Sequence, residues 1–196
     1  MTTQTLTHPG AATASDSSLT AALEAMLTIR AFEEKSAALQ AAGQSPSMCT
    51  SVGQEASAVG VIRNLTADDK ILTNHRSAGH LIARGADPAR IMAEIQGKAT
   101  GYCKGKSGSL HISVKDLGVV LTSTIVGGEL SLAPGVGLSL AMSGSDAIVV
   151  VFFGDGAACG ASSTRPSISP RSGSSRSSSS ARTTNGRPSS TAARRC

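Results

Sequence analysis

The residues Gly154, Asp155 and Gly156 have the types and the spacing to hold a metal-bound phosphate. Glycine has no Cβ, so the backbone at these positions can approach a phosphate closely. The carboxylate between them offers an oxygen ligand of the kind that Mg2+ prefers. The triplet therefore indicates a magnesium diphosphate site, with Asp155 as the metal ligand, although a plain strand end with an Asx-turn has the same residues.

The triplet directly follows the run Ile148–Phe153, in which every residue is β-branched or aromatic. A continuous run of this kind is typical of a strand that is buried on both faces of a parallel sheet and lies near its centre. Open α/β sheets bind ligands outside the carboxyl ends of their strands. The triplet thus stands where a ligand would be expected.

Other segments have the patterns of further elements around this strand. A strand is predicted over residues 68–75, and it runs directly into Arg76, whose charge would suit an anionic ligand but would equally suit an exposed surface. Helices are predicted from Ser18 to a stop signal at Gly43, and over residues 51–60, 87–96 and 130–141. The predicted helices would flank a central parallel sheet that contains the predicted strands.

The segment from Gly101 to His111 is rich in glycine and lysine and resembles a P-loop. It has three residues, where a P-loop has four, between Gly101 and the run Gly105–Ser107, and no buried strand precedes it. A nucleotide triphosphatase is therefore rejected. A mobile loop near an anionic ligand fits the composition better.

The two ends of the chain differ in charge. All 13 acidic residues lie at or before Asp155, whereas residues 160–196 contain seven arginines, thirteen serines and no acid. Such a segment cannot bury enough apolar surface to fold alone. The expected organisation is a disordered stretch over residues 1–17, one domain over 18–159 and a disordered tail over 160–196.

The four cysteines, at positions 49, 103, 159 and 196, form no Cys-x-x-Cys pair. Free thiols in a reducing cytoplasm are expected, and neither a zinc site nor a disulfide framework is indicated. No apolar run reaches the length of a membrane span, and the polar start of the chain lacks the features of a signal peptide. A cytoplasmic protein without a membrane partner is expected.

Several short motifs occur in an order that is specific as a set, although each is weak singly. The motifs are Ile29–Glu34, Gly53–Ala56, His75–Arg76, Gly105–His111, Ile125–Gly127, Ala133–Gly135 and Gly154–Ala158. In this order they closely resemble the alpha subunit of the thiamine-diphosphate-dependent 2-oxoacid dehydrogenases, which include the pyruvate, branched-chain and acetoin enzymes.

The resemblance implies a thiamine-diphosphate-binding fold and oxidative decarboxylation of a 2-oxo acid. The implied assembly is a heterotetramer of this subunit with a beta subunit. The assembly transfers the acyl group to a lipoyl acyltransferase, and no nucleic acid partner is expected. The alpha subunit would hold the diphosphate and Mg2+. The beta subunit would bring the carboxylate that activates the aminopyrimidine ring.

The same resemblance implies roles for individual residues. Asp155 would be the Mg2+ ligand, and His111, with Lys106, falls in the family's mobile active-site loop and is the candidate catalytic residue. The residues implied in cofactor binding are His75, Arg76, Thr124, Val126, Gly154, Gly156 and Ala157.

Three positions depart from the family pattern. His75 stands where a tyrosine is usual, while Ala78 and Cys49 stand where histidines are usual. The departures indicate a subgroup with another substrate, so the resemblance leaves the particular 2-oxo acid open.

After Gly154–Ala158 the family continues with a helix, a buried strand and a pair of asparagines, one of which completes the metal site. The segment 160–196 has none of these, but restoring one deleted base after the Cys159 codon allows a reading that contains all three. In that reading Ser177–Arg182 become Val-Leu-Phe-Val-Cys-Glu, followed by Asn-Asn. A frameshift is therefore expected, with loss of activity in this chain.

The alternative is a native Arg/Ser-rich tail that makes the chain a non-enzymatic RNA-binding or scaffold protein. RNA retention would then be salt-sensitive and would be lost on deletion of residues 160–196. The coding DNA separates the two hypotheses.

Overall fold

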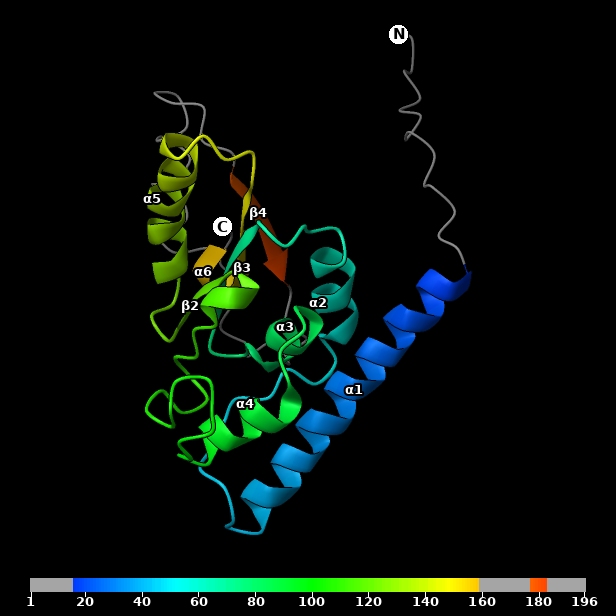
Figure 1. Cartoon of the computed structure of the whole chain (residues 1–196). Coiled ribbons are helices and arrows are strands. Elements are labelled where there is room, and N and C mark those ends of the chain that lie inside the picture. Colours follow the sequence, from blue (N-terminus) through cyan, green and yellow to red (C-terminus); the bar gives the residue numbers. More distant parts are fainter. Residues whose placement is uncertain (1–15, 159–176, 183–196) are drawn as a thin grey trace, which may run out of the picture.

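The computed structural model describes residues 16–158 and 177–182. Its sheet has four strands that are all parallel, in the order β2-β1-β3-β4 (Figure 1). The strands are β1 (Lys70–Asn74), β2 (Val119–Ser123), β3 (Val149–Gly154) and β4 (Ser177–Arg182). The α/β fold with a parallel sheet that the sequence indicates is confirmed.

Strand β3 is an inner strand, as its composition predicts. It pairs with β1 on one side and with β4 on the other, and Val149–Phe153 are buried. Val150 and Phe152 pack into the core on one face of the sheet, and Val149, Val151 and Phe153 into the core on the other. Alternate residues of an apolar strand can fill both cores because successive side chains point to opposite faces.

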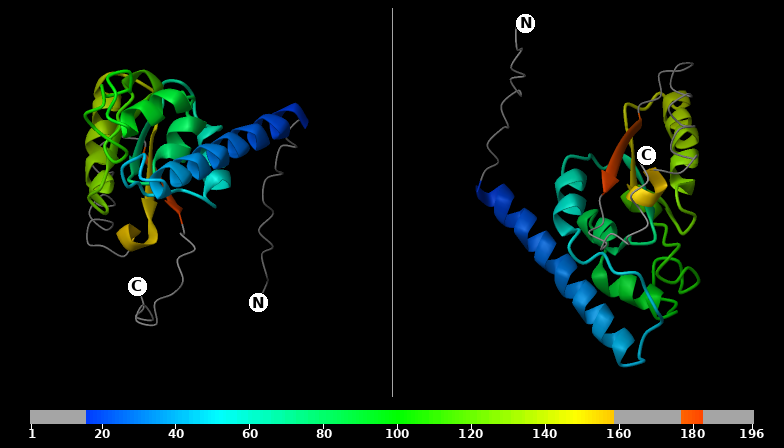
Figure 2. Two further views of the ribbon diagram at one scale, coloured as in Figure 1. Left: turned by 90° about the horizontal axis from the view of Figure 1, so that it is seen from below. Right: turned by 180° about the vertical axis from the view of Figure 1, so that it is seen from behind.

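The helices cover the two faces of the sheet (Figures 1 and 2). Helices α1 to α4 contribute to the larger core, and α5 and α6 to the smaller one. The amino-terminal end of α1 extends beyond the rest of the molecule in Figure 1. The helices are α1 (Asp16–Ala41), α2 (Glu55–Ile62), α3 (Ala78–Ala83), α4 (Pro88–Ile95), α5 (Gly128–Met142) and α6 (Asp155–Ala158), with a short 3-10 turn at Lys115–Leu117.

The predicted elements α1, α2, α4, α5, β1 and β3 are present, with ends that shift by a few residues. Helix α4 begins as its sequence indicates, because the Asp87 carboxylate accepts a hydrogen bond of 2.8 Å from the Ala89 amide and Pro88 follows it. Helix α3 and strand β2 are not predicted from the sequence. No helix among residues 16–158 is long and apolar enough to cross a membrane.

Within the segment where a disordered tail is expected, the structure describes Ser177–Arg182. These residues form β4 and pair in parallel register with β3, from Ser177 opposite Val149 to Arg182 opposite Gly154. Strand pairing uses backbone groups, so an exposed edge can be paired by a segment whose side chains carry no strand signal. Residues 16 and 17, expected to be disordered, belong to α1, and the other residues expected to be disordered, 1–15, 160–176 and 183–196, lie outside the described part of the chain.

Candidate active site

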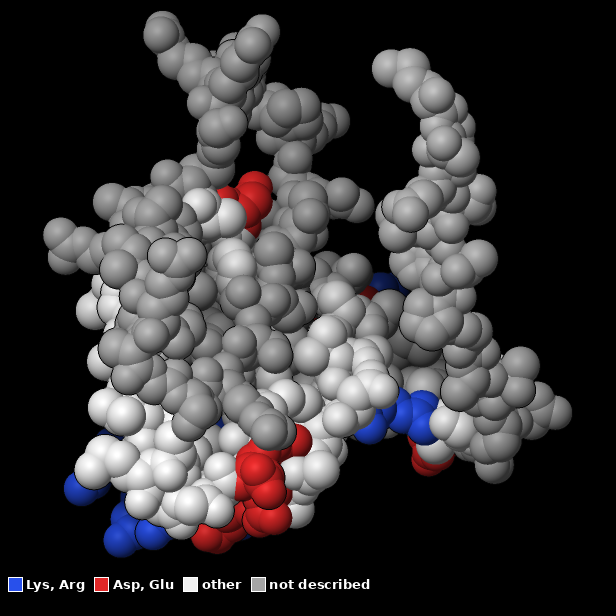
Figure 3. Space-filling view, turned by 90° about the horizontal axis from the view of Figure 1, so that it is seen from above, with Lys and Arg blue, Asp and Glu red and all other residues white. Residues whose placement is uncertain are grey.

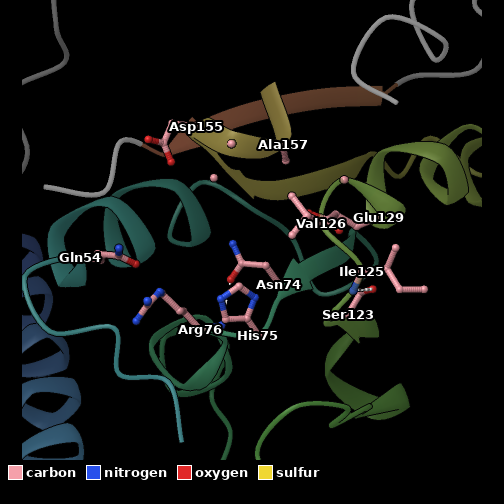
Figure 4. Close-up of a pocket in the computed structure, with 13 residues that line it drawn as sticks. Gln54, Asn74, His75, Arg76, Ser123, Ile125, Val126, Glu129, Asp155 and Ala157 are labelled. Carbon is pink, nitrogen blue, oxygen red and sulfur yellow. Dashed lines mark hydrogen bonds between the residues drawn. The ribbon is translucent and has the colours of Figure 1, made fainter. Parts of the chain in front are cut away.

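A pocket of about 230 Å3 opens at the carboxyl ends of β1, β2 and β3 (Figure 4). Three strand ends meet here because the strands run parallel, which is the usual ligand position in an open α/β sheet. Gln54 joins them from the amino-terminal end of α2. The pocket is lined by Gln54, Asn74, His75, Arg76, Ser123, Ile125, Val126, Gly127, Glu129, Gly154, Asp155, Gly156 and Ala157.

Arg76 brings positive charge to the pocket and is held from two sides. Its backbone amide donates a hydrogen bond of 3.0 Å to Asn74 Oδ1, and its guanidinium Nη1 donates to the carbonyl of Thr50. Burial lowers the pKa of the neighbouring His75, and the charge of Arg76 lowers it further. The pair therefore combines a fixed cation with an imidazole that favours its neutral form.

The segment that carries Gln54 is fixed by Glu55. The Glu55 carboxylate Oε1 accepts hydrogen bonds from the Arg30 guanidinium at 2.8 Å and from the Gly53 amide at 3.0 Å. Burial alone would raise the pKa of Glu55, but these hydrogen bonds outweigh it and lower the pKa. The charged carboxylate thus ties α1 to the start of α2 beside the pocket.

The glycines at the carboxyl end of β3 and the start of α6 have open space beside them. A Cβ at Gly154 or Gly156 would meet no atom of the described residues within 4 Å. Packing against the described part of the chain therefore does not require glycine at these two positions. Room beside the backbone, next to the Asp155 carboxylate, is compatible with a phosphate-bearing ligand.

The turn between β2 and α5 forms the opposite wall. Gly127 has φ +78°, a conformation that glycine adopts without strain, and it precedes the first turn of α5. The Ile125 amide donates a hydrogen bond of 3.1 Å to Ser123 Oγ, which fixes the turn. Ile125 and Val126 are 72% and 65% exposed, so this wall offers apolar surface.

The structure gathers most of the predicted site residues at this pocket. His75, Arg76, Val126, Gly154, Asp155, Gly156 and Ala157 all line it. Thr124 and His111 are exposed and are not among the lining residues. Sequence reasoning missed Gln54, Asn74, Ser123, Ile125, Gly127 and Glu129; of these, Gln54, Ile125 and Gly127 stood within quoted motifs.

The loop that carries Lys106 is tied to α4 by Glu94. The Glu94 carboxylate is buried and accepts hydrogen bonds from the amides of Cys103, Gly105 and Ser107, at 2.7, 2.9 and 2.8 Å, and from the Ser107 hydroxyl at 2.8 Å. These hydrogen bonds attach the segment before His111 to α4. The pattern of glycine and lysine in the sequence does not indicate this attachment.

Replacing Gly101 by alanine is expected to lower the free energy of unfolding by about 2 kcal/mol, because a Cβ there would lie 2.4 Å from Glu94 Oε2 and 2.6 Å from Glu94 Cα. Gly60→Ala is the matched control, since a Cβ on that residue of α2 meets nothing within 4 Å and a gain of about 0.5–1 kcal/mol is expected. Urea denaturation followed by circular dichroism measures both. Equal effects for the two variants would contradict the close packing of Gly101 on Glu94.

Within residues 16–158 no group of three or more His, Cys, Asp or Glu side chains is placed to hold a metal ion. Asp155 is exposed at the rim of the pocket. The described protein groups do not by themselves make a complete metal site, and further oxygen ligands would have to come from a bound ligand or from other residues.

Residues 24–163 match the protein family described as dehydrogenase E1 component. The chain is 47% identical over 133 residues to the alpha subunit of acetoin:2,6-dichlorophenolindophenol oxidoreductase of Bacillus subtilis (strain 168), covering 67% of this chain and 40% of that protein. It is 38% identical over 134 residues to the pyruvate dehydrogenase E1 component subunit alpha of Rhizobium meliloti (strain 1021), covering 68% and 38%.

The acetoin oxidoreductase alpha subunit of Cupriavidus necator is 38% identical over 133 residues, again with 40% of its length covered. The chain thus spans about two fifths of the length of the curated relatives that it matches. The matched region contains the whole pocket and the strands β1, β2 and β3 that build it. The chain belongs to the dehydrogenase E1 component family, as a fragment of a 2-oxoacid dehydrogenase alpha subunit.

Proposed function

We propose that the pocket binds thiamine diphosphate with Mg2+. The observation that carries the proposal is the meeting of Arg76, Asp155 and the open backbone at Gly154 and Gly156 at one pocket, in a chain of the E1 family. An anionic diphosphate suits the guanidinium, and a magnesium ion suits the carboxylate. Bound thiamine diphosphate would supply the nucleophilic carbon that decarboxylation of a 2-oxo acid needs.

The proposed roles follow the position of each residue. Arg76 and His75 bind the diphosphate, Asp155 holds Mg2+, and the backbone of Gly154, Gly156 and Ala157 approaches the phosphates. Val126 and the adjacent Thr124 contact the organic part of the cofactor from the wall of the pocket that exposes Ile125 and Val126. His111 lies outside the pocket, so a catalytic role for it requires the loop after Glu94 to move or a partner chain to complete the site.

The proposed assembly is a heterotetramer with a beta subunit, which hands the acyl group to a lipoyl acyltransferase in the cytoplasm. The relatives include alpha subunits of both acetoin oxidoreductase and pyruvate dehydrogenase. A small 2-oxo acid or acetoin is therefore the proposed substrate. His75, Ala78 and Cys49, which depart from the general family pattern, are the residues to vary in a test of substrate choice.

We also propose that the segment after Cys159 is read in a shifted frame. Two observations support this. The family match ends at residue 163, close to the position of the shift. Strand β4 occupies Ser177–Arg182, which are the residues that the shifted reading turns into Val-Leu-Phe-Val-Cys-Glu. The backbone thus forms a strand where the other frame encodes one.

Binding of thiamine diphosphate to the purified 196-residue chain tests the proposal. We expect measurable but weak binding by titration calorimetry in the presence of Mg2+, with Arg76→Ala at least about tenfold weaker because the diphosphate loses its cation. Lys35→Ala, on the exposed side of α1, is the charge-matched control and should bind as the unmodified chain does. Absence of binding, or an equal loss in both variants, would count against the proposed pocket.

A further inference from the structure

Glu33 is a buried acid of α1 that the proposed function does not use. The residue is fully buried, and its carboxyl Oε1 is hydrogen-bonded to the hydroxyl of Ser51, which is also buried. Its other carboxyl oxygen, Oε2, has no hydrogen-bond partner within the described part of the chain. Burying an acid is costly, so one that is kept for a contact with a single serine calls for an explanation.

The segment that contains Ser51 also holds the cation of the pocket. The carbonyl of Thr50, the residue before Ser51, accepts the hydrogen bond from Arg76 Nη1. In Figure 4 the Arg76 side chain extends toward the side of the pocket on which Gln54 lies. The direction of the guanidinium therefore depends on the position of the backbone at Thr50.

Close contacts fix this backbone from several sides. At its far end the Gly53 amide donates a hydrogen bond of 3.0 Å to Glu55 Oε1. A Cβ at Gly79 of α3 would lie 3.2 Å from Ser51 Oγ, so α3 packs tightly against this hydroxyl. Ser51 is thus enclosed between Glu33 of α1 and Gly79 of α3.

We propose that Glu33 is a positioning residue for the diphosphate site, which acts on Arg76 through the segment Thr50–Ser51. By holding Ser51, it fixes the Thr50 carbonyl that orients the guanidinium. The inference rests on the proposed function, because it takes a diphosphate as the ligand of Arg76. A hydroxyl can donate to a carboxylate or accept from a protonated carboxyl, so the contact exists in both protonation states, and an amide can also make it.

A double-mutant cycle with Arg76→Ala tests the inference on the full 196-residue chain. Glu33→Leu removes the hydrogen bond to the segment, whereas Glu33→Gln keeps a group that can make it. Ser36→Ala is the matched control, because the Ser36 hydroxyl is also buried on α1 but donates to the Phe32 carbonyl of the same helix, at 2.8 Å. Phosphorus NMR titration of inorganic diphosphate with Mg2+ measures the affinities, and circular dichroism checks that each variant is folded.

Glu33→Leu is expected to bind inorganic diphosphate about tenfold more weakly than the unmodified chain does, whereas Glu33→Gln and Ser36→Ala bind it within about twofold of the unmodified chain. In a chain that already carries Arg76→Ala, Glu33→Leu is expected to cause no further loss, because Glu33 acts through the side chain that has been removed.

An unchanged affinity in Glu33→Leu, or a loss that adds in full to the loss in Arg76→Ala, would overturn the inference alone. If Glu33→Leu does not fold, Ser51→Ala takes its place in the cycle with the same expectations, since it removes the other half of the contact. If the unmodified chain binds neither inorganic diphosphate nor thiamine diphosphate, the proposed function fails together with the inference.

Discussion

Glu94→Ala is expected to lower the free energy of unfolding by about 3–5 kcal/mol, a large share of the stability of a domain of this size. The carboxylate accepts four hydrogen bonds, three of them from backbone amides that have no other acceptor once the side chain is removed. The side chain is fully buried, so water cannot replace it without a rearrangement. Thermal and urea unfolding followed by circular dichroism measure the change.

Glu34→Gln, at an exposed position of α1, is the control and should change the stability by less than about 0.5 kcal/mol. Hydrogen exchange adds a local readout, since the amides of Cys103, Gly105 and Ser107 should lose protection in Glu94→Ala more than those of β3 do. A variant that unfolds like the unmodified chain and keeps these amides protected would show that the loop does not depend on Glu94.

The same anchor predicts a pH dependence. Burial alone would raise the pKa of Glu94, but hydrogen bonds from Ser107, Gly105 and Cys103 outweigh it and lower the pKa. A lowered folded-state pKa means that the stabilisation is complete above the unfolded-state value of about 4.3 and is lost as the pH falls through the folded-state value. The difference in stability between the unmodified chain and Glu94→Ala should therefore shrink below about pH 4.

The sequence predicts the elements whose patterns are local. Strand β3 is recognisable because burial on both faces leaves no polar alternation, and α4 because Asp87 and Pro88 mark its start. Helix α3 has only six residues and no side-chain cap hydrogen bond, and β2 runs directly into a glycine turn. Neither element is long enough for a periodic pattern of hydrophobic residues to be recognised.

The pocket residues that sequence reasoning missed depend on contacts between distant segments. Asn74 reaches the pocket because it ends β1, and Glu129 because α5 begins at the same edge of the sheet. Glu94 reads as an ordinary charged residue of a helix, yet it binds a loop that is nine to thirteen residues further along. Strand β4 is set by pairing with β3, which a serine-rich sequence does not reveal.

Figure 3 shows described acidic and basic side chains in small groups of both signs on the face that is visible there. No continuous basic surface is seen among the described residues on that face. The fold and the family match together favour an enzyme subunit over an RNA-binding protein, and the Arg/Ser-rich segment is then a separate question of reading frame.

Restoring one base after the Cys159 codon is expected to raise the affinity for thiamine diphosphate by about 100-fold and to give turnover of a 2-oxo acid with a beta subunit, where the 196-residue chain gives none. In the restored frame the segment at β4 carries Val, Leu and Phe, which would cover the edge and faces beside β3, and the two asparagines that follow would bring a further oxygen ligand to the metal held by Asp155. The present chain has serine at Ser177–Ser180 and lacks that apolar surface.

An insertion of three bases at the same point is the matched control, because it lengthens the chain by one residue and keeps the Arg/Ser-rich reading. It should leave both affinity and turnover as they are in the 196-residue chain. Sequencing the locus gives the first answer, since the restored frame must run well past residue 196 and encode tryptophan and paired asparagines. Near-normal 2-oxo acid oxidation by the 196-residue chain with a beta subunit would refute the frameshift, since β4 as written would then suffice to complete the site.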